Sequence, residues 1–490
     1  MIPMLTQSKT ENTYFNNMQW SFITNLNYMQ ISSSLQKMFL KMEKAYLSET
    51  VFMVLKELLM NANRANAKKI FLEKNNVDVL NEEAYREGLK RFKAEILNNW
   101  EVNRGGISDQ KTYVKMNIEE NDNNIVFRIT NNSPLLPIEE ERIKLRLQKA
   151  ESYKTVIDAY KDMGDPSESA GLGLVMSVLL LRNIGLNRDK LILIRNDTET
   201  TFKVVIPNEI IPVEVSSIIK DKLLNELKSL PSLSSSLQRI ISLCEDTNMD
   251  MKDLVLEIEK NPSVSAEILK LANSVGFIMK SKSMSISQAV KIIGVKAILR
   301  LLYAMGSMNT LNKSYSRMEA QWEHSRRTSY FANLLTKENN LGKLGESVIS
   351  GALLHNIGKI LLLSADREIF PVIQELTKNR ATENSKVLEE AAIGLSYSKL
   401  GSMLAEKWNF PEDLKCIIEY HQQPYMAPEK YQKISEIVYV ANNLAMRFQG
   451  NIHFFSLNDE ILKNYKINSE KDFEDMFTRF EERYNKEVKD

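Results

Sequence analysis

Residues 352–359 read Ala-Leu-Leu-His-Asn-Ile-Gly-Lys and belong to an ordered series of short motifs in the second half of the chain. The series starts with Leu-Pro-Ser-Leu at 230–233 and ends with Glu-Tyr-His-Gln-Gln-Pro at 419–424. Around these motifs, apolar residues recur at helical spacing, and turn and breaker residues separate one helical stretch from the next. The pattern predicts an all-helical domain over residues 216–445.

Histidine occurs only in the last third of the chain, at His324, His355, His421 and His453. Neutral imidazole is a common ligand of transition metals, and the first three histidines fall on separate predicted helices. They could therefore converge on a metal ion. The alternative is that each ring is simply packed in, or caps, its own helix, and the residues alone leave both interpretations open.

The ordered motifs resemble the HD-related output domain, the HDOD family, over about residues 216–445. The Leu-Ala-Asn-Ser run at 271–274 and the Trp-x-x-Pro run at 408–411 are part of this resemblance. The related HD phosphohydrolases bind metal through histidines and acidic residues. The resemblance places three histidines at such positions: His324, His355 and His421.

The sequence departs from the HD pattern at three of its metal-ligand positions. Asn356 replaces the Asp of the His-Asp pair, Asn442 replaces a later Asp, and Tyr397 occupies a histidine position. A hydrolytic two-metal site needs carboxylates to hold its ions, and a tyrosine is a poor ligand at neutral pH. We therefore expect a degenerate remnant with no structural metal, and a metal-dependent HD phosphohydrolase is the less favoured alternative.

A second candidate site lies in the first half of the chain. Glu57 and Asn61 are four residues apart in a predicted helix over 35–67, so they share one face. They could hold a hydrated Mg²⁺ ion with phosphates, with Glu57 polarising a water molecule, or they could be a polar stripe on a surface helix. Glycines in the run Ser-Ala-Gly-Leu-Gly-Leu at 169–174 could admit phosphates to a helix start, or mark a tight turn.

The same half of the chain predicts a sheet. An α+β sandwich, with helices covering one face of the sheet, is expected over residues 35–210, with a charged insertion at about 75–110. Runs of strand-forming residues bounded by turn signals mark the predicted strands: 68–73, 113–118, 125–130, 190–195 and 201–207.

Four sequence boxes occur in order along this half of the chain: ELLMNANRANAKKI at 57–70, TNNSPLLP at 130–137, ESAGLGLVMS at 168–177 and ETTFKVVIP at 199–207. Together they resemble the GHKL ATPase fold of histidine kinases, gyrase, the ninety-kilodalton heat-shock chaperone and mismatch-repair ATPases. The resemblance implies that Glu57 is the general base and that Asn61 is a ligand of the Mg²⁺ ion bound with ATP. It also implies a nucleotide-binding set at the adenine and phosphate positions: Asn131, Gly171, Leu172 and Gly173.

The sequence also departs from the GHKL pattern. Asn131 replaces the adenine-reading Asp, and Ser133 and Leu135 replace two glycines, so ATP binding is expected to be weakened if present. No histidine precedes Glu57, which excludes a phosphoacceptor imidazole in this region. The remaining enzyme alternatives are an active GHKL ATPase and an anti-sigma-factor-like serine/threonine kinase.

Composition limits the remaining possibilities. The chain has 490 residues, a formal net charge of +1 and two cysteines, so neither a basic field for nucleic acid nor a disulfide framework is present. The N-terminus lacks the order of a signal peptide. We expect a cytoplasmic protein with no nucleic-acid or membrane partner, an N-terminal extension at 1–34 and a charged C-terminal tail at 446–490.

The two degenerate enzyme-like regions predict a bacterial signal-transduction protein. In this hypothesis a histidine-kinase-like ATP-binding domain is coupled to an HDOD output domain. It acts through nucleotide-dependent or protein–protein contacts, and the hypothesis includes a homodimer as its assembly and Mg²⁺-ATP as its cofactor. Closure of the charged segment 139–168 over the N-terminal site is the expected conformational change.

Overall fold

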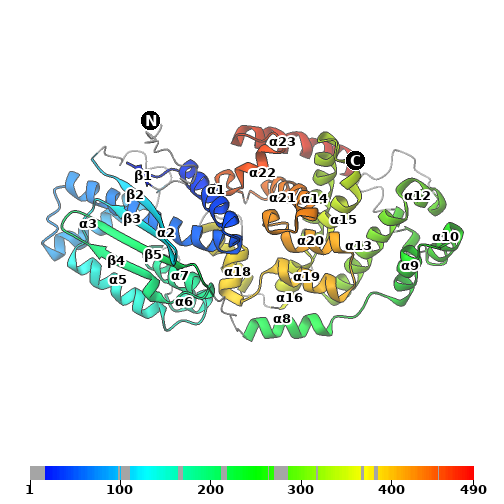
Figure 1. Ribbon diagram of the computed structural model, residues 1–490, viewed down its shortest axis with the longest axis horizontal. Helices are drawn as coiled ribbons and strands as arrows, with labels where there is room; N and C mark the ends of the chain where they lie inside the picture. The colour runs from blue at the N-terminus through cyan, green and yellow to red at the C-terminus, as the bar shows by residue number, and fades with distance from the viewer. Residues whose placement is uncertain are drawn as a thin grey trace. The chain divides into compact units, whose positions relative to one another are not determined.

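The chain divides into two compact units, Met1–Val215 and Ser216–Asp490, which are described separately (Figure 1). The computed structural model describes residues 17–97, 100, 111–163, 169–210, 218–262, 264–266, 268–269, 285–315, 318–365, 369–379, 385–450 and 452–489. The Leu-Ala-Asn-Ser motif at 271–274 and part of the predicted insertion at 75–110 lie outside these residues.

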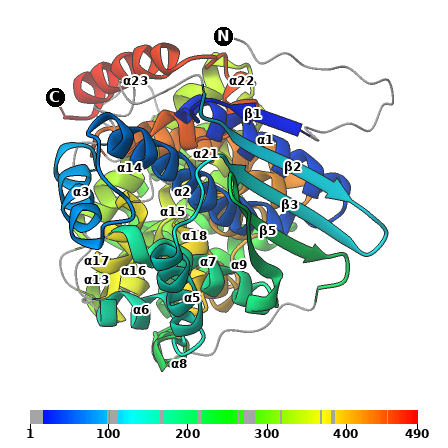
Figure 2. The same ribbon diagram turned by 90° about the vertical axis from the view of Figure 1, so that its left-hand side faces the viewer.

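The N-terminal unit is built on a five-stranded antiparallel sheet in the order β1-β2-β3-β5-β4 (Figure 1), of which Figure 2 labels β1, β2, β3 and β5. Four of its strands fall where the sequence predicts them, so the α+β class is confirmed. The strand bounds are β1 Asn17–Trp20, β2 Val114–Glu120, β3 Asn124–Asn131, β4 Leu191–Arg195 and β5 Thr200–Pro207.

Helices pack on one face of this sheet. Along β3, Ile125, Phe127 and Ile129 are buried, whereas Arg128 and Thr130 between them are only partly buried, which is the alternation of a half-covered strand. The helices are α1 Asn25–Lys41, α2 Ser48–Lys74, α3 Glu82–Glu95, α5 Pro137–Ala150, α6 Val156–Met163 and α7 Ser169–Asn183.

Two predictions of local structure are wrong in this unit. The predicted strand at 68–73 is the last part of α2, because its consecutive apolar residues are buried on a helix, where Phe71 packs on Phe92 of α3. The predicted single helix over 35–67 is two helices, α1 and α2. They are separated at Glu43, whose φ of 56° interrupts the helix.

The predicted N-terminal extension is also part of the fold. Residues 17–34 supply β1 and the first half of α1, which begins with a capping box between Thr24 and Asn27. A four-residue edge strand is too short to give a readable pattern, which is why the sequence missed it. Within the predicted insertion, α3 packs on α2 and closes a small apolar cluster.

The C-terminal unit contains only helices and turns within the described part of residues 218–489, as predicted. Its core is formed by α13, α14, α15, α19, α20 and α21. The longer helices are α8 Ile218–Ser229, α9 Ser235–Glu245, α10 Met251–Glu259, α12 Ile286–Ile293, α13 Val295–Ser314, α14 Glu319–Glu338, α15 Gly345–Leu354, α16 Ile357–Ala365, α17 Ile369–Asn379, α18 Lys386–Ile393, α19 Tyr397–Lys407, α20 Glu412–Tyr420, α21 Glu429–Arg447 and α23 Glu470–Tyr484.

Glycines set the spacing of α16 and α19. A Cβ atom added to Gly358 would lie 1.9 Å from the carbonyl oxygen of Tyr397 and 2.4 Å from the backbone nitrogen of Gly401. The two helices therefore touch backbone to backbone at the glycine of the His-Asn-Ile-Gly-Lys motif. This contact holds the residues of α16 and α19 that flank the histidines in fixed positions.

The predicted charged tail folds onto this unit. Residues 459–463 form α22, and α23 packs its buried Phe473, Phe480 and Tyr484 against the rest of the unit. One stretch, Gly342–Leu363, is long and apolar enough to cross a membrane by length and composition, with 78% of its most apolar window buried inside the protein. Such burial is typical of a core helix.

Candidate functional site

The N-terminal candidate site forms where α2 meets α7. Glu57 on α2 is only 3% exposed, and Gly173 on α7 lies directly against its carboxylate. A Cβ atom added at position 173 would lie 1.7 Å from Oε1 of Glu57. Only glycine allows this approach, so the structure brings together two predicted site residues from separate boxes.

Asn61 is half-buried one turn further along α2, and Gly171 and Leu172 lie in the first turn of α7. The residues just before this helix, 164–168, lie outside the described part of the chain. The predicted phosphate-binding residues therefore lie at the start of α7, beside the helix that carries Glu57 and Asn61.

Asn131 lies at the end of β3 and is tied to the same helix. Its Nδ2 donates to Oδ1 of Asn66 at 3.3 Å, and Nδ2 of Asn66 donates to the carbonyl oxygen of Tyr113 at 2.9 Å. With its nitrogen used in this way, the carboxamide of Asn131 keeps its oxygen as the acceptor that an adenine amino group would need. The residues from three boxes thus lie around one stretch of α2.

Over the described residues 139–163, the segment that we expected to close over the site as a charged loop is mostly helical. It contains α5 and α6, and Glu139 at the start of α5 is hydrogen-bonded to Lys68 and, at 2.7 Å, to the hydroxyl of Tyr85. Contact with the Lys68 ammonium and these hydrogen bonds outweigh burial and lower the pKa of Glu139, so its carboxylate is ionised. The first charged residue of this segment, Glu139, therefore forms a partly buried ion pair with Lys68.

The C-terminal candidate site is a cluster of imidazoles in the helical core. Nε2 of His324 and Nε2 of His355 lie 2.8 Å and 3.1 Å from Oδ1 of Asn442, and the two rings are 5.5 Å apart. His324 comes from α14, His355 from the end of α15 and Asn442 from α21. The amide oxygen of Asn442 therefore lies between two of the histidines.

His421 completes this cluster from the end of α20. Its ring is 4.9 Å from that of His355, and its Nε2 lies 3.1 Å from the hydroxyl of Tyr397. Nδ1 of His421 faces the carbonyl oxygen of Ile418 at 3.0 Å and therefore donates to it. The hydroxyl of Tyr397 then donates to Nε2. The ring nitrogen that could bind a metal ion instead accepts a hydrogen bond from the tyrosine.

Burial keeps these imidazoles neutral. Desolvation lowers the pKa of His355 to about 4, and it lowers the pKa values of His324 and His421 well below the ordinary value. Nδ1 of His355 donates to the carbonyl oxygen of Ala352 at 2.6 Å, which leaves its Nε2 as an acceptor facing an amide oxygen. The polar centre of the domain therefore contains a buried polar atom without a suitable hydrogen-bond partner among the residues that the structure describes.

Two more polar atoms at this centre also lack a hydrogen-bond partner inside the described chain. Within the described residues, Nδ1 of His324 and Oδ1 of Asn356 are buried without a hydrogen-bond partner. No group of three or more histidine, cysteine or acidic side chains in the described part of the chain is arranged to hold a metal ion. The predicted remnants His324, His355 and His421 therefore come together as a neutral cluster, and the positions of Asn356 and Asn442 supply amides instead of the carboxylates that a hydrolytic two-metal site uses.

The structure adds one ionisable group that the sequence did not reveal. Glu389 on α18 is fully buried and accepts hydrogen bonds from the hydroxyl of Ser385 at 2.7 Å and the backbone nitrogen of Tyr397 at 2.8 Å. Burial raises its pKa to about 7, although the nearby Lys359 opposes the shift. A carboxylate in an apolar helical run gives no motif that sequence reasoning could detect.

Comparison with known proteins identifies this helical unit. Residues 230–424 match the family model of the HDOD domain. An uncharacterized protein of Treponema pallidum (strain Nichols) is 29% identical over 415 residues, which cover 84% of this chain and 80% of that protein. The relative spans both units of the present chain.

Solved structures share a limited likeness with the chain. An HDOD domain protein of unknown function from Geobacter sulfurreducens is 19% identical and covers 55% of this chain and 95% of its own, with a TM-score of 0.42. A protein proposed to act in signal transduction, from Marinobacter aquaeolei VT8, is 17% identical and covers 61% and 75%, with the same TM-score of 0.42. At these scores the likeness adds no weight to the family match.

The helical unit with its buried histidine centre is therefore of the HDOD class. The protein is an HDOD-domain protein over residues 230–424. The family match does not extend to the N-terminal unit, so the GHKL resemblance of that unit remains a prediction.

Proposed function

We propose that this protein is a bacterial signalling protein in which the HDOD domain acts as an output module through protein contacts. The supporting observation is the neutral centre formed by His324, His355, Asn442 and their neighbours, which lacks the anionic ligands of a hydrolase. The domain keeps the HDOD sequence motifs, and the side chains at its centre are buried and packed against each other.

We further propose that the N-terminal unit binds Mg²⁺-ATP and that occupancy sets the output. The approach of Gly173 to Glu57 supports this proposal, because a catalytic-type carboxylate is held at the start of a glycine-containing helix. Asn61 would help to hold the Mg²⁺ ion, and the oxygen of Asn131 would accept from adenine. The positive end of α7 would face the phosphates, as helix N-termini do in many nucleotide sites.

Calorimetric titration of the full chain with Mg²⁺-ATP tests this proposal. Saturable binding that is lost in Asn61→Ala is the expected result. Asn123→Ala is the matched control, because it makes the same change at an exposed turn of the same unit and should bind as wild type does. Absence of binding at millimolar ATP in wild type would show that the N-terminal unit is not a nucleotide sensor.

A working ATPase or a serine/threonine kinase is the second candidate, favoured by the retention of Glu57 in its buried position. As a general base it would take a proton from the attacking water or hydroxyl, a role that often contributes a factor of about 10² or more in rate. Phosphate release and phosphotransfer should then fall in Glu57→Gln while nucleotide binding remains. Equal background rates in wild type and variant would exclude catalysis and leave the binding proposal intact.

A further inference from the structure

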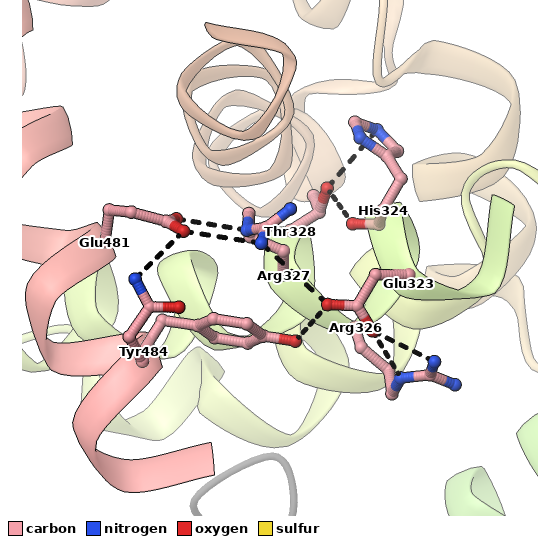
Figure 3. Close-up of polar contacts among 8 residues, drawn as sticks. Glu323, His324, Arg326, Arg327, Thr328, Glu481 and Tyr484 are labelled. Carbon is pink, nitrogen blue, oxygen red and sulfur yellow. Dashed lines mark hydrogen bonds and ion pairs between the residues drawn. The ribbon is translucent and has the colours of Figure 1, made fainter. Parts of the chain in front are cut away.

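Buried polar side chains of the two units are arranged in different ways. In the C-terminal unit, Arg327 is only 3% exposed and its Nε lies 3.0 Å from Oε2 of Glu481 (Figure 3). The hydroxyl of Tyr484 donates to Oε1 of Glu323 at 2.9 Å in the same cluster. These groups pair with one another and hold α23 on α14. In the N-terminal unit, buried carboxamides instead form a directional relay that leads to Asn131, a proposed nucleotide-binding residue.

The relay starts at the backbone of Tyr113, which is held on both sides. Its nitrogen donates to Oδ1 of Asn132 at 2.7 Å, and the residue that follows it, Val114, pairs with Asn131 across β2 and β3. The carbonyl oxygen of Tyr113 accepts a hydrogen bond from Nδ2 of Asn66 at 2.9 Å. A carbonyl oxygen can only accept, so the atom of the Asn66 side chain that faces it has to be the nitrogen.

The orientation of Asn66 in turn sets that of Asn131. Because Nδ2 of Asn66 faces Tyr113, its Oδ1 faces Asn131 and accepts a hydrogen bond from Nδ2 of Asn131 at 3.3 Å. The two carboxamides are buried, with 3% and 4% of these residues exposed. Turning either amide around would bring two oxygens or two nitrogens together, which is costly away from water. The relay therefore fixes the other end of the Asn131 carboxamide, Oδ1, as an acceptor.

A fixed acceptor distinguishes the two purine bases. Adenine carries an exocyclic amino group, which donates, where guanine carries a carbonyl oxygen, which only accepts. Oδ1 of Asn131 would form a hydrogen bond with the first and would face the second oxygen to oxygen. Without Asn66, the carboxamide of Asn131 could turn about χ2 and present either its oxygen or its nitrogen to the base. An aspartate would need no such partner, because both of its oxygens accept.

We propose that Asn66 is a positioning residue that gives the nucleotide site its preference for adenine over guanine. It acts through Asn131, because its own carboxamide is bonded to that side chain and to the backbone of Tyr113. This inference rests on the proposed binding of Mg²⁺-ATP by the N-terminal unit. It adds a residue that selects the base, and it explains how an amide can serve as a one-way acceptor.

Calorimetric titration of the full chain with Mg²⁺-ATP and with Mg²⁺-GTP tests this role through the ratio of the two dissociation constants. Wild type should bind ATP more tightly than GTP by about tenfold or more. In Asn66→Ala the two constants should approach each other, because the freed carboxamide of Asn131 can serve either base. If the alanine variant does not fold, Asn66→Ser replaces it. The serine hydroxyl can donate and accept, so it satisfies its neighbours without setting a direction, and the preference should fall as well.

Asn63→Ala is the matched control. Asn63 lies on the same helix, is 4% exposed, and its carboxamide is bonded to the backbone nitrogen and oxygen of Ile23 at 3.2 Å and 3.1 Å. Its loss should destabilise the unit but leave the ratio at the wild-type value. In the combined variant Asn66→Ala/Asn131→Asp, a carboxylate supplies acceptors in every orientation, so the preference for ATP should return. A purely structural role of Asn66 would not produce this rescue.

The outcomes separate this inference from the proposed function. A wild-type chain that binds ATP and GTP equally well would overturn the inference and leave nucleotide binding intact. The same conclusion would follow if a folded Asn66→Ala or Asn66→Ser variant kept the wild-type ratio or lost both nucleotides. A wild-type chain that binds neither nucleotide would overturn the inference together with the proposed function.

Discussion

The two units of this protein treat buried ionisable groups in opposite ways. In the N-terminal unit, Glu139 is partly buried and stays ionised, because Lys68 and Tyr85 contact its carboxylate. In the HDOD domain, His355 stays neutral and Glu389 holds its proton up to about pH 7. A buried group keeps its charge only where an opposite charge or hydrogen-bond donors compensate the lost hydration.

The difference indicates what each unit can recognise. The N-terminal unit keeps a carboxylate–ammonium pair, Glu139 with Lys68, and Lys68 lies on the same helix as Glu57. The polar centre of the HDOD domain is neutral and closely packed. We therefore expect ligand chemistry in the N-terminal unit and rigidity in the HDOD domain, and the variants below test both expectations.

The largest expected effect is on the packing of the HDOD domain. Gly358→Ala would place a Cβ atom 1.9 Å from the carbonyl oxygen of Tyr397, and backbone cannot move aside as a side chain can. Urea denaturation should show a loss of about 3 kcal/mol or more in the free energy of unfolding. Gly345→Ala is the control, because nothing lies within 4 Å of its added Cβ. Equal stability of the two variants would contradict the backbone contact.

Acid should destabilise the HDOD domain through its neutral histidines. Below pH 6.5 the unfolded chain binds a proton that folded His355 does not accept until about pH 4, so stability falls as pH drops through this window. The loss from this residue amounts to about 3 kcal/mol at its lower end. Urea denaturation between pH 8 and pH 5 should show the slope. His355→Gln should reduce it, whereas the exposed His453→Gln should not.

Glu389 should act with the opposite sign. Its pKa is raised to about 7 from 4.5, so between these values the unfolded chain ionises while the folded chain keeps the proton. Stability from this group is fully present below pH 4.5 and is lost as pH rises through 7, by up to about 3 kcal/mol. Glu389→Gln should therefore gain stability at pH 8 relative to pH 5. Glu429→Gln, at an exposed position, is the control, and a parallel response would contradict the assignment.

Sequence reasoning was most accurate where chemistry and spacing coincide. It located the histidines that the fold brings within 4.9–5.5 Å of each other, and it identified the substitutions that leave them without carboxylates. It failed at residues 68–73, where a run of consecutive apolar residues fits a strand or a buried helix equally well. It could not detect Glu389, because the burial that shifts its pKa arises from tertiary packing, which the local spacing of residues does not report.

The smallest effect on stability is expected for Gly173→Ala, which can be compared directly with Gly358→Ala in the other unit. As at Gly358, an added Cβ would collide with a neighbour, but here the neighbour is the end of the Glu57 side chain. That carboxylate can rotate away, and alanine favours the helix by about 1 kcal/mol, so the free energy of unfolding should change by less than about 1 kcal/mol. Displacement of Glu57 should nevertheless weaken nucleotide binding or turnover in Gly173→Ala. If the variant lost as much stability as Gly358→Ala, then α2 and α7 would be as rigidly packed as the HDOD core, and the contrast between a ligand-binding unit and a rigid one would fail.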